Sequence, residues 1–276
     1  MRPAEVLRRA SDYLDRHGVE SPSATAEALM MAILGTDRTG LYTRTRGLDM
    51  LEARTFGRAL CQRCTGTPLQ HLTGEQAFRR ISLEVRPGVF VPRPETEVLV
   101  GLALGEVVGV AGPLVIDVGT GTGAVALSVK DERPDATVFA TDLSAEAVEL
   151  ARSNGARLGL DITVLEGDLF DPLPARLLGH VDVVMSNPPY IDPGVVDDLP
   201  AEVRADPELA LVGGVDLIDR LATDAARWLR SAGVLAVEIG EDQGAETIRL
   251  LEGRFREVRV EPDLTGRDRV VLGRRT

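Results

Sequence analysis

The residues best suited to chemistry form the stretch Asn187-Pro188-Pro189-Tyr190. The apolar run before it, residues 181–186, predicts a buried strand that ends just before Asn187. Two consecutive prolines stiffen the backbone, because each fixes its own φ and restricts the residue before it. A rigid Asn amide oxygen, a nearby backbone carbonyl and an aromatic ring together form a receptor for a planar NH2 group. The alternative interpretation is a proline-rich turn that only follows a core strand.

A second motif lies upstream, where an apolar strand predicted at 114–118 leads into Gly119-Thr120-Gly121-Thr122-Gly123. Glycines allow a tight turn and let the backbone approach a ligand closely. The G-x-G-x-G spacing differs from the dinucleotide-binding G-x-G-x-x-G pattern, and no phosphate-binding G-K-[ST] sequence follows. Taken alone, such a turn does not establish a site.

The strand predicted at 136–141 supplies a further observation, because Asp142 follows it directly. Asp142 lies close to the separation at which such folds place a carboxylate to accept hydrogen bonds from ribose hydroxyls. Its alternative role is the N-cap of the next helix, which Ser144 would serve equally well.

The order of these motifs resembles that of S-adenosylmethionine-dependent methyltransferases of the Rossmann-like class. Within that class the chain resembles the HemK/PrmC family, which methylates the glutamine amide of peptide chain release factors. Three further stretches carry the resemblance: PLQHLTG at 68–74, VPRPETE at 91–97 and DLTGRDR at 263–269. The match spans most of the chain from about Pro68 onward, whereas the earlier residues resemble the family only in length and helical character.

The resemblance implies S-adenosylmethionine as methyl donor, with no metal. It implies these cofactor-binding residues: Asp117, Gly119, Thr120, Gly121, Thr122, Gly123, Asp142, Asp168, Leu169 and Asn187. Asp168 would accept from the adenine amino group, with Leu169 and Phe170 flanking the ring; the alternative is an Asp that caps the following turn. Family members can carry an aromatic residue where Leu169 stands, so we expect a weaker stacking contact here.

The catalytic residues implied are Asn187, Pro188, Pro189 and Tyr190. A glutamine amide nitrogen is a poor nucleophile, so it must be held in line with the methyl group, roughly 3–3.5 Å away. The Asn187 oxygen and the Pro188 carbonyl would accept the two amide hydrogens, while Tyr190 packs along the side chain. No strong base is needed early, and positioning and electrostatics carry most of the rate. The implied partner is the GGQ domain of class 1 peptide chain release factors.

The same receptor suits any planar exocyclic amine, so an adenine-N6 or guanine-N2 nucleic-acid methyltransferase is the alternative function. The net charge of −12 disfavours attraction to nucleic-acid phosphates. Residues 1–75 carry ten Arg and nine acidic side chains, whereas the rest carries 21 basic and 34 acidic ones. A third hypothesis is a non-catalytic cofactor-binding or scaffolding protein. The intact Asp117, Gly119, Asp142 and Asn187 argue against it.

Composition limits the remaining classes. A chain of 276 residues can form one sizeable domain and a smaller one. With no run of eighteen apolar residues and no signal-peptide pattern, we expect a cytoplasmic protein without membrane association. We also expect a monomer. Cys61 and Cys64 are spaced C-x-x-C, but His71 is the only nearby additional ligand, so we expect two helix residues and not a metal or redox site.

The elements that must position the motifs begin with a helical region. Residues 1–75 predict helices at 4–17, 23–34 and 48–64, with Ser23 capping the second. This bundle is either a packing module or, as the resemblance implies, the substrate-recognition domain. Residues 76–92 predict a β-hairpin linker with its turn at Pro87-Gly88 and a returning segment at 89–91.

The third region, residues 93–276, alternates strands and helices. It opens with a helix at 95–108, next to which Arg93, Glu95 and Glu97 either order the cofactor pocket or cap the helix. Strands are expected at 114–118, 136–141, 161–165, 181–186, 233–240, 255–261 and 269–273, with helices after the first three and near 214–230. The last two strands have a short connection and must pair antiparallel.

The alternation predicts an α/β doubly wound sheet. Together with the resemblance, we expect a Rossmann-like class I methyltransferase fold. Its sheet has seven strands and is mainly parallel with the last strand antiparallel, and a β-hairpin joins it to the small N-terminal helical bundle.

Overall fold

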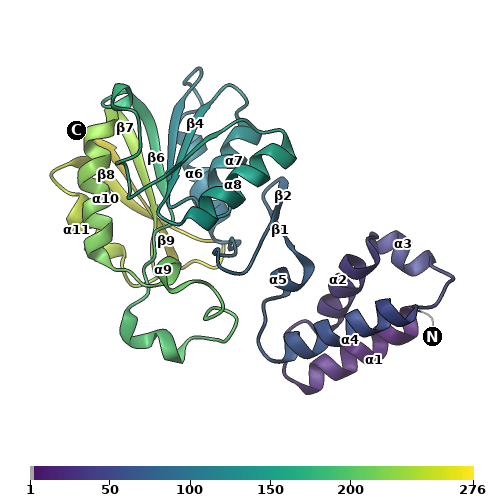
Figure 1. The fold of residues 1–276 in the computed structure, drawn as a ribbon. Coiled ribbons are helices and arrows are strands. Elements are labelled where there is room, and N and C mark those ends of the chain that lie inside the picture. The colour runs from purple at the N-terminus through teal and green to yellow at the C-terminus, as the bar shows by residue number, and fades with distance from the viewer. Residues whose placement is uncertain (1–2) are drawn as a thin grey trace. The chain divides into compact units, whose positions relative to one another are not determined.

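The computed structural model describes residues 3–276 and divides into two compact units (Figure 1). The helical unit comprises the residues up to Glu75 together with two later segments, Val85–Pro87 and Pro200–Ala205. The sheet unit comprises Gln76–Glu84, Gly88–Leu199 and Asp206–Thr276. The two short segments that return to the helical unit have no signature in the sequence pattern.

The helical unit confirms the three long predicted helices. Its helices are α1 (Pro3–Arg16), α2 (Pro22–Leu34), α3 (Arg38–Thr43), α4 (Met50–Cys64) and α5 (Leu69–Thr73). They pack around a core that includes Leu14, Leu29 and Phe56. The predicted Ser23 cap is wrong, because α2 begins at Pro22 and Ser21 occupies the N-cap position without a side-chain bond. A proline at the first helical position loses no hydrogen bond, so the helix can start there.

The sheet unit contains the predicted seven strands. They are β3 (Leu114–Val118), β4 (Thr137–Asp142), β5 (Thr163–Glu166), β6 (Val181–Ser186), β7 (Leu229–Glu238), β8 (Phe255–Pro262) and β9 (Asp268–Arg275). The order across the sheet is β5-β4-β3-β6-β7-β9-β8. β9 is antiparallel to both of its neighbours, whereas the pairs from β5 to β7 are parallel. The predicted sheet is therefore confirmed, including the antiparallel last strand.

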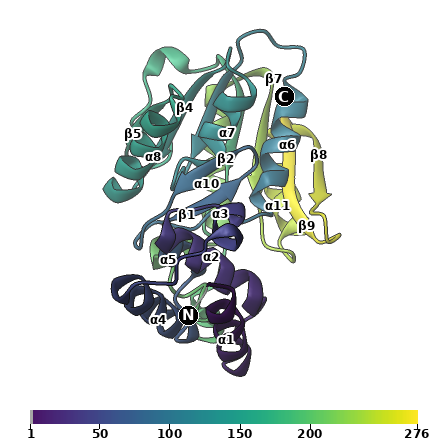
Figure 2. The ribbon, with the colours of Figure 1, turned by 90° about the vertical axis from the view of Figure 1, so that its right-hand side faces the viewer.

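Helices cover both faces of this sheet (Figures 1 and 2). One core lies under α6 (Thr96–Glu106), α7 (Ala124–Glu132) and α8 (Ala145–Leu158). The other lies under α10 (Val215–Trp228) and α11 (Gly244–Leu251), the second of which the sequence pattern did not predict. Alternate strand residues serve the two cores, because successive side chains point to opposite faces. In β6, Val183 and Met185 face the first core and Val184 faces the second.

The helix predicted after the third strand of this sheet is wrong. β5 is followed by a single 3-10 turn, η1 (Ala175–Leu177), before the chain enters β6. Pro172 and Pro174 stand in this segment, and each removes a backbone donor and disfavours a helical residue before it. The remaining short elements are η2 (Pro193–Asp198) and α9 (Glu208–Leu211).

The β-hairpin is present but lies earlier than predicted. Its strands are β1 (Glu75–Phe78) and β2 (Ile81–Glu84), so the turn falls at Arg79 and Arg80, where Arg79 has a φ of 50°. Pro87-Gly88 does form a turn, but residues 89–91 form no strand. Val91 N–H donates to Asp206 Oδ1 at 3.1 Å, so this backbone pairs with a side chain and not with a strand.

Candidate active site

Asn187 follows directly after β6, whose six residues are all buried. Its side chain is held by Thr96 at the start of α6, because Nδ2 donates to Thr96 Oγ1 at 3.1 Å. Ser186, just before it, donates through Oγ to the Val118 carbonyl at 2.8 Å and ties the end of β6 to the end of β3. Among residues 3–276 no partner is found for Asn187 Oδ1, so that oxygen remains available to accept a hydrogen bond.

The backbone after Asn187 is fixed from the opposite side. Ile191 N–H donates to the Leu211 carbonyl at 2.9 Å, and Gly213 N–H donates to the Ile191 carbonyl at 3.1 Å. A Cβ at Gly213 would lie 2.0 Å from the Pro189 carbonyl oxygen, so only glycine fits there. The N-P-P-Y stretch is therefore held in place by the segment around Leu211 and Gly213.

Tyr190 is partly buried, and its backbone carbonyl accepts from Gln243 Nε2 at 3.1 Å. Burial raises the pKa of its phenol above the usual range, and the nearby Glu238 carboxylate raises it further. The phenol therefore stays protonated at neutral pH. This state suits a packing and hydrogen-bonding role and not that of a general base.

The glycines of the loop between β3 and α7 have two different structural roles. Gly119, Gly121 and Gly123 have φ values of 74°, 56° and 86°, a region that other residues rarely adopt. Around the Cβ positions of Gly119 and Gly121 there is nothing within 4 Å, so this side of the loop is open. A Cβ at Gly123 would meet Leu127 Cδ1 at 2.9 Å, so the third glycine serves helix packing.

Asp117 is buried and hydrogen-bonds both this loop and the start of α7. Its side chain is 1% exposed, and Oδ2 accepts from Thr120 Oγ1 at 2.6 Å and from Ala126 N–H at 3.1 Å. Burial raises its pKa to about 7, although these two hydrogen bonds oppose the shift. The Thr122 carbonyl accepts from Asn154 Nδ2 at 3.0 Å, which fixes the second half of the loop to α8.

Asp142 lies at the end of β4 and faces the same loop. Its Oδ2 accepts from Gly121 N–H at 2.8 Å and its Oδ1 from Ser144 N–H at 2.9 Å. Ser144 is the N-cap of α8, since its Oγ accepts from Ala147 N–H at 3.3 Å. The alternative role of Asp142 as that cap is therefore wrong. Burial raises its pKa, but its oxygens have lone pairs left for further donors.

The segment after β5 differs from expectation in one residue. Asp168 Oδ2 accepts from Arg220 Nη2 at 2.7 Å in an exposed ion pair that sequence reasoning missed. Leu169 is partly buried with a φ of 45°. Phe170 is 3% exposed and stacks on Trp228 with ring centroids 5.9 Å apart. Phe170 is thus a core residue, and the expectation that it flanks a bound ring is wrong.

The stretch at 91–97 positions the site through residues whose roles the sequence left open. Arg93 forms an ion pair with Asp206 and lies over the Phe90 ring at 5.2 Å. Glu97 Oε1 accepts from Arg79 N–H at 3.0 Å. Glu95 occupies the N-cap position of α6 without a side-chain cap bond. Thr96, in this stretch, hydrogen-bonds Asn187 of N-P-P-Y, and no spacing rule gave a signal for it.

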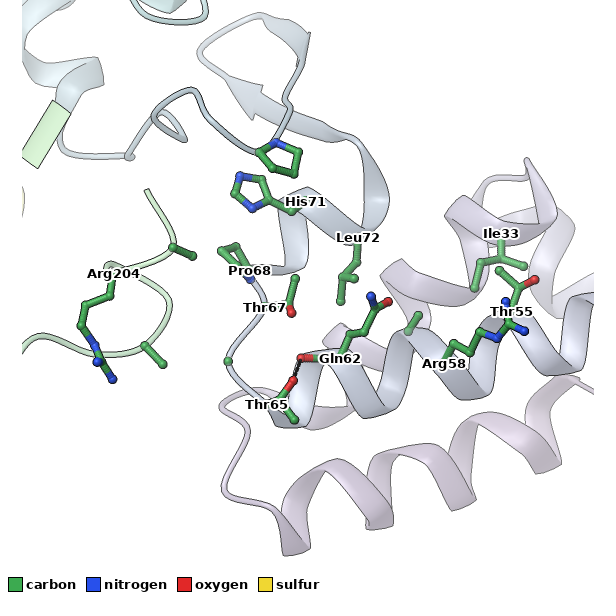
Figure 3. A pocket seen from close by; sticks show the side chains of 15 residues that line it. Ile33, Thr55, Arg58, Gln62, Thr65, Thr67, Pro68, His71, Leu72 and Arg204 are labelled. Carbon is green, nitrogen blue, oxygen red and sulfur yellow. Dashed lines mark hydrogen bonds between the residues drawn. The ribbon is translucent and has the colours of Figure 1, made fainter. Parts of the chain in front are cut away.

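The helical unit has its own pocket, of about 770 Å³ (Figure 3). Its lining includes Arg58, Gln62, Pro68, Leu72 and Arg204, and every lining residue belongs to this unit. Figure 3 shows Thr65 Oγ1 donating to the Gln62 carbonyl, at 2.9 Å.

Cys61 and Cys64 are free cysteines. Within residues 3–276 no three His, Cys, Asp or Glu side chains gather closely enough to hold a metal ion.

Within the same residues, every helix is too short or too polar to cross a membrane.

Comparisons with known proteins find related methyltransferases along the whole chain. Residues 5–74 match the family described as PrmC N-terminal domain, and residues 96–202 match the Methyltransferase small domain. A release factor glutamine methyltransferase of Moorella thermoacetica is 40% identical, with 98% of each chain covered. One of Deinococcus radiodurans is 41% identical over 100% of this chain and 99% of the relative.

Among solved structures, the T. thermophilus 16S rRNA N2 methyltransferase RsmC, in complex with AdoMet and guanosine, shares the fold. The TM-score is 0.55 at 21% identity, over 73% of this chain and 50% of that one.

Proposed function

The chain belongs to the release factor glutamine methyltransferase family, and we propose that it methylates the GGQ-motif glutamine of class 1 peptide chain release factors. The methyl group goes from S-adenosylmethionine to the side-chain amide nitrogen. The main structural support for this proposal is the Asn187 amide. Its nitrogen donates a hydrogen bond to Thr96, and its oxygen is available to accept one from the substrate. The runner-up, an exocyclic amine of nucleic acid, draws no support from relatives matched over their full length.

The glycine loop and the two acids beside it fit S-adenosylmethionine. This group supplies a methyl carbon made electrophilic by a positively charged sulfonium. The open side of Gly119 and Gly121 leaves room for a ligand against the backbone. Asp142 retains acceptor capacity for ribose hydroxyls, and a ligand donor would offset the cost of burying its charge. Asp168 and Leu169 would hold the adenine, which requires Asp168 to share or release Arg220.

The residues of N-P-P-Y orient the substrate amide. Asn187 Oδ1 and the Pro188 carbonyl accept the two hydrogens of the glutamine NH2 group, which turns the nitrogen lone pair toward the methyl donor. Tyr190, protonated at neutral pH, packs along the flat glutamine side chain. As the nitrogen becomes positively charged, both accepted hydrogen bonds strengthen, because charge-assisted bonds are stronger than neutral ones. The nitrogen then loses one of its two hydrogens as a proton to solvent, which leaves the neutral N-methyl amide.

The helical unit is the part that recognises the protein substrate. A glutamine in a small loop offers few contacts, so affinity for a large substrate must come from elsewhere on the enzyme, and remote contacts also help orientation. The pocket lined by Arg58 and Arg204 supplies a surface where such contacts can form. We further propose that the enzyme acts in the cytoplasm, where its release factor substrate works in translation, and that it acts as a monomer, because one chain supplies both the glycine loop and N-P-P-Y.

Incubation with S-adenosylmethionine labelled in its methyl group tests the function directly. We expect label on a purified class 1 release factor, and none when its GGQ glutamine is replaced by glutamate. Ribosomal RNA and genomic DNA serve as competing acceptors in the same assay. Label on nucleic acid and none on the release factor would favour the runner-up, and binding of the methyl donor without any transfer would favour a scaffolding protein.

A further inference from the structure

Glu238 is a buried carboxyl group that the proposed chemistry does not use. It ends β7, and the pairing of Ser186 with Val237 between β6 and β7 brings it to the same sheet edge as Asn187. The side chain is 1% exposed, and its Oε2 has no hydrogen-bond partner within residues 3–276. Burying a carboxyl oxygen without a partner costs free energy, so its presence here calls for an explanation.

Thr96 links this carboxyl group to N-P-P-Y. Its side chain is buried, it lies close enough to the Glu238 carboxyl group to lower that group's pKa, and its oxygen accepts from Asn187 Nδ2 at 3.1 Å. A hydroxyl has one hydrogen to donate, and an ionised carboxylate can only accept. Because the Thr96 oxygen accepts from Asn187, the Thr96 hydrogen is free to be directed at the neighbouring Glu238 carboxylate. The direction of this chain selects the NH2 end of the Asn187 amide.

We propose that Thr96 and Glu238 are positioning residues that turn the Asn187 amide so that Oδ1 faces the substrate glutamine. This inference rests on the proposed function. A reversed Asn187 would present its own NH2 group to the substrate NH2 group, and two donors form no hydrogen bond. Without an acceptor at residue 96, both orientations of the amide become available.

The ionisation of Glu238 adds a pH dependence to this arrangement. Burial raises its pKa to about 7, while the neighbouring Thr96 and Arg269 favour the charged form and Glu95 and Asp263 oppose it. Tyr190, the other titratable group facing Glu238, has a raised pKa and is neutral in this range. The arrangement of Asn187, Thr96 and an ionised Glu238 is thus complete above about pH 7. We therefore expect kcat to fall as the pH drops below 7. The variant Glu238→Gln keeps an acceptor oxygen beside Thr96 but does not titrate.

Replacing Thr96 by valine tests the first step. Thr96→Val keeps the shape but removes the hydroxyl, so we expect kcat to fall about tenfold or more with unchanged calorimetric affinity for S-adenosylmethionine. Thr96→Ser keeps the hydroxyl and should retain most activity. Thr247→Val removes another buried hydroxyl, in α11, and serves as the matched control with normal kcat. Normal turnover of Thr96→Val would overturn the proposal.

A double variant tests whether Thr96 acts through Asn187. In an Asn187→Ala background, Thr96→Val should cause no further loss of kcat, because the group it orients is gone. Losses that multiply would show that Thr96 acts independently and would overturn the proposal. In Glu238→Gln, the acid-side fall of kcat should disappear; a pH profile identical to that of the unaltered enzyme would remove Glu238 from the chain.

A readout without substrate separates this inference from the proposed function. The Asn187 side-chain NH2 signals in NMR spectra, assigned by their loss in Asn187→Ala, should show one hydrogen-bonded, slowly exchanging proton. This signature should vanish in Thr96→Val and persist in Thr96→Ser, whichever molecule accepts the methyl group. Signals unchanged by Thr96→Val would contradict the positioning role even if release factor is methylated.

Discussion

Asp142 and Gly121 are joined by a hydrogen bond in which the glycine N–H donates to the carboxylate Oδ2 at 2.8 Å. The bond connects the end of β4 to the loop that follows β3, so one carboxylate can shape the loop and also receive a ligand. A single substitution there would disturb both tasks, which makes Asp142 the most direct probe of the cofactor site.

Asp142→Ala is expected to weaken binding of S-adenosylmethionine by about 1–3 kcal/mol, the range for leaving polar groups without a partner. Isothermal titration calorimetry measures this loss. Ser144→Ala is the matched control, because it removes the cap of α8 and lowers stability by about 1 kcal/mol without touching the loop. Equal affinity in Asp142→Ala and the unaltered enzyme would refute the ribose assignment.

Asn187→Ala should lose methyl transfer while keeping most of its cofactor affinity. The Asn187 oxygen is proposed to act on the substrate nitrogen, so the loss appears in kcat, by about a hundredfold or more. Single-turnover assays with labelled methyl donor and intact release factor measure it. Near-normal turnover would mean that N-P-P-Y is only a rigid turn.

Gly213→Ala is expected to impair the site without altering any group that does chemistry. The added Cβ would lie 2.0 Å from the Pro189 carbonyl oxygen, so N-P-P-Y must move, and small displacements of positioning groups can cost about a hundredfold in rate. Gly214→Ala has nothing within 4 Å of its Cβ and is the neighbouring control. Equal kcat values for the two variants would show that this contact does not hold N-P-P-Y in place.

Arg58→Glu should raise KM for intact release factor on the order of fivefold or more, because it reverses a charge in the pocket of the helical unit. Activity on a short glutamine peptide should be low and the same with or without the substitution. Arg8→Glu, on an exposed position of α1 outside the pocket lining, is the control. If both reversals affect KM equally, general charge and not the pocket governs recognition.

Protein stability should fall as the pH rises toward 8. The pKa of Asp117 is about 7 when folded and about 3.9 when unfolded, so the folded state binds the extra proton between these values. The free energy of unfolding therefore decreases as pH increases through this window, by up to about 1.4 kcal/mol per pH unit. Glu238 contributes with the same sign.

Asp117→Asn isolates the share of one group, because its amide oxygen can still accept from Thr120 and Ala126. Thermal unfolding followed between pH 5 and 8 should show a higher Tm than the unaltered protein at pH 8, with a shallower slope. A steeper or unchanged slope would show that the Asp117 carboxylate is charged in the folded state without penalty.

The sequence predicted the features whose cause is local. A strand, a glycine turn and a helix follow from apolar runs and breakers, and parallel strands bring Gly119, Asp142 and Asn187 to one sheet edge. Partners distant in the chain were not predictable in this way. Thr96 lies 91 residues before Asn187, and no periodicity in one sequence pairs a helix start with a strand end.

Two misplaced elements show different limits. The helix expected after β5 could have been rejected from Pro172 and Pro174, which stand where it would run. The hairpin turn at Arg79 and Arg80 could not be predicted from residue types, because arginine is not a usual turn residue. Arg79 nevertheless adopts a φ of 50° there. Pro87 and Gly88 do form the predicted turn, but no strand directly follows it.

The place of β9 between β7 and β8 has a consequence for biosynthesis. Translation produces β8 before β9, yet within residues 3–276 β8 pairs in the sheet only with β9. Until residues 268–275 have been made, β7 and β8 expose unpaired edges, which invite association with other nascent chains. Frameshifts or premature stops between β8 and β9 should therefore give insoluble polypeptides, even though the glycine loop and N-P-P-Y are already complete.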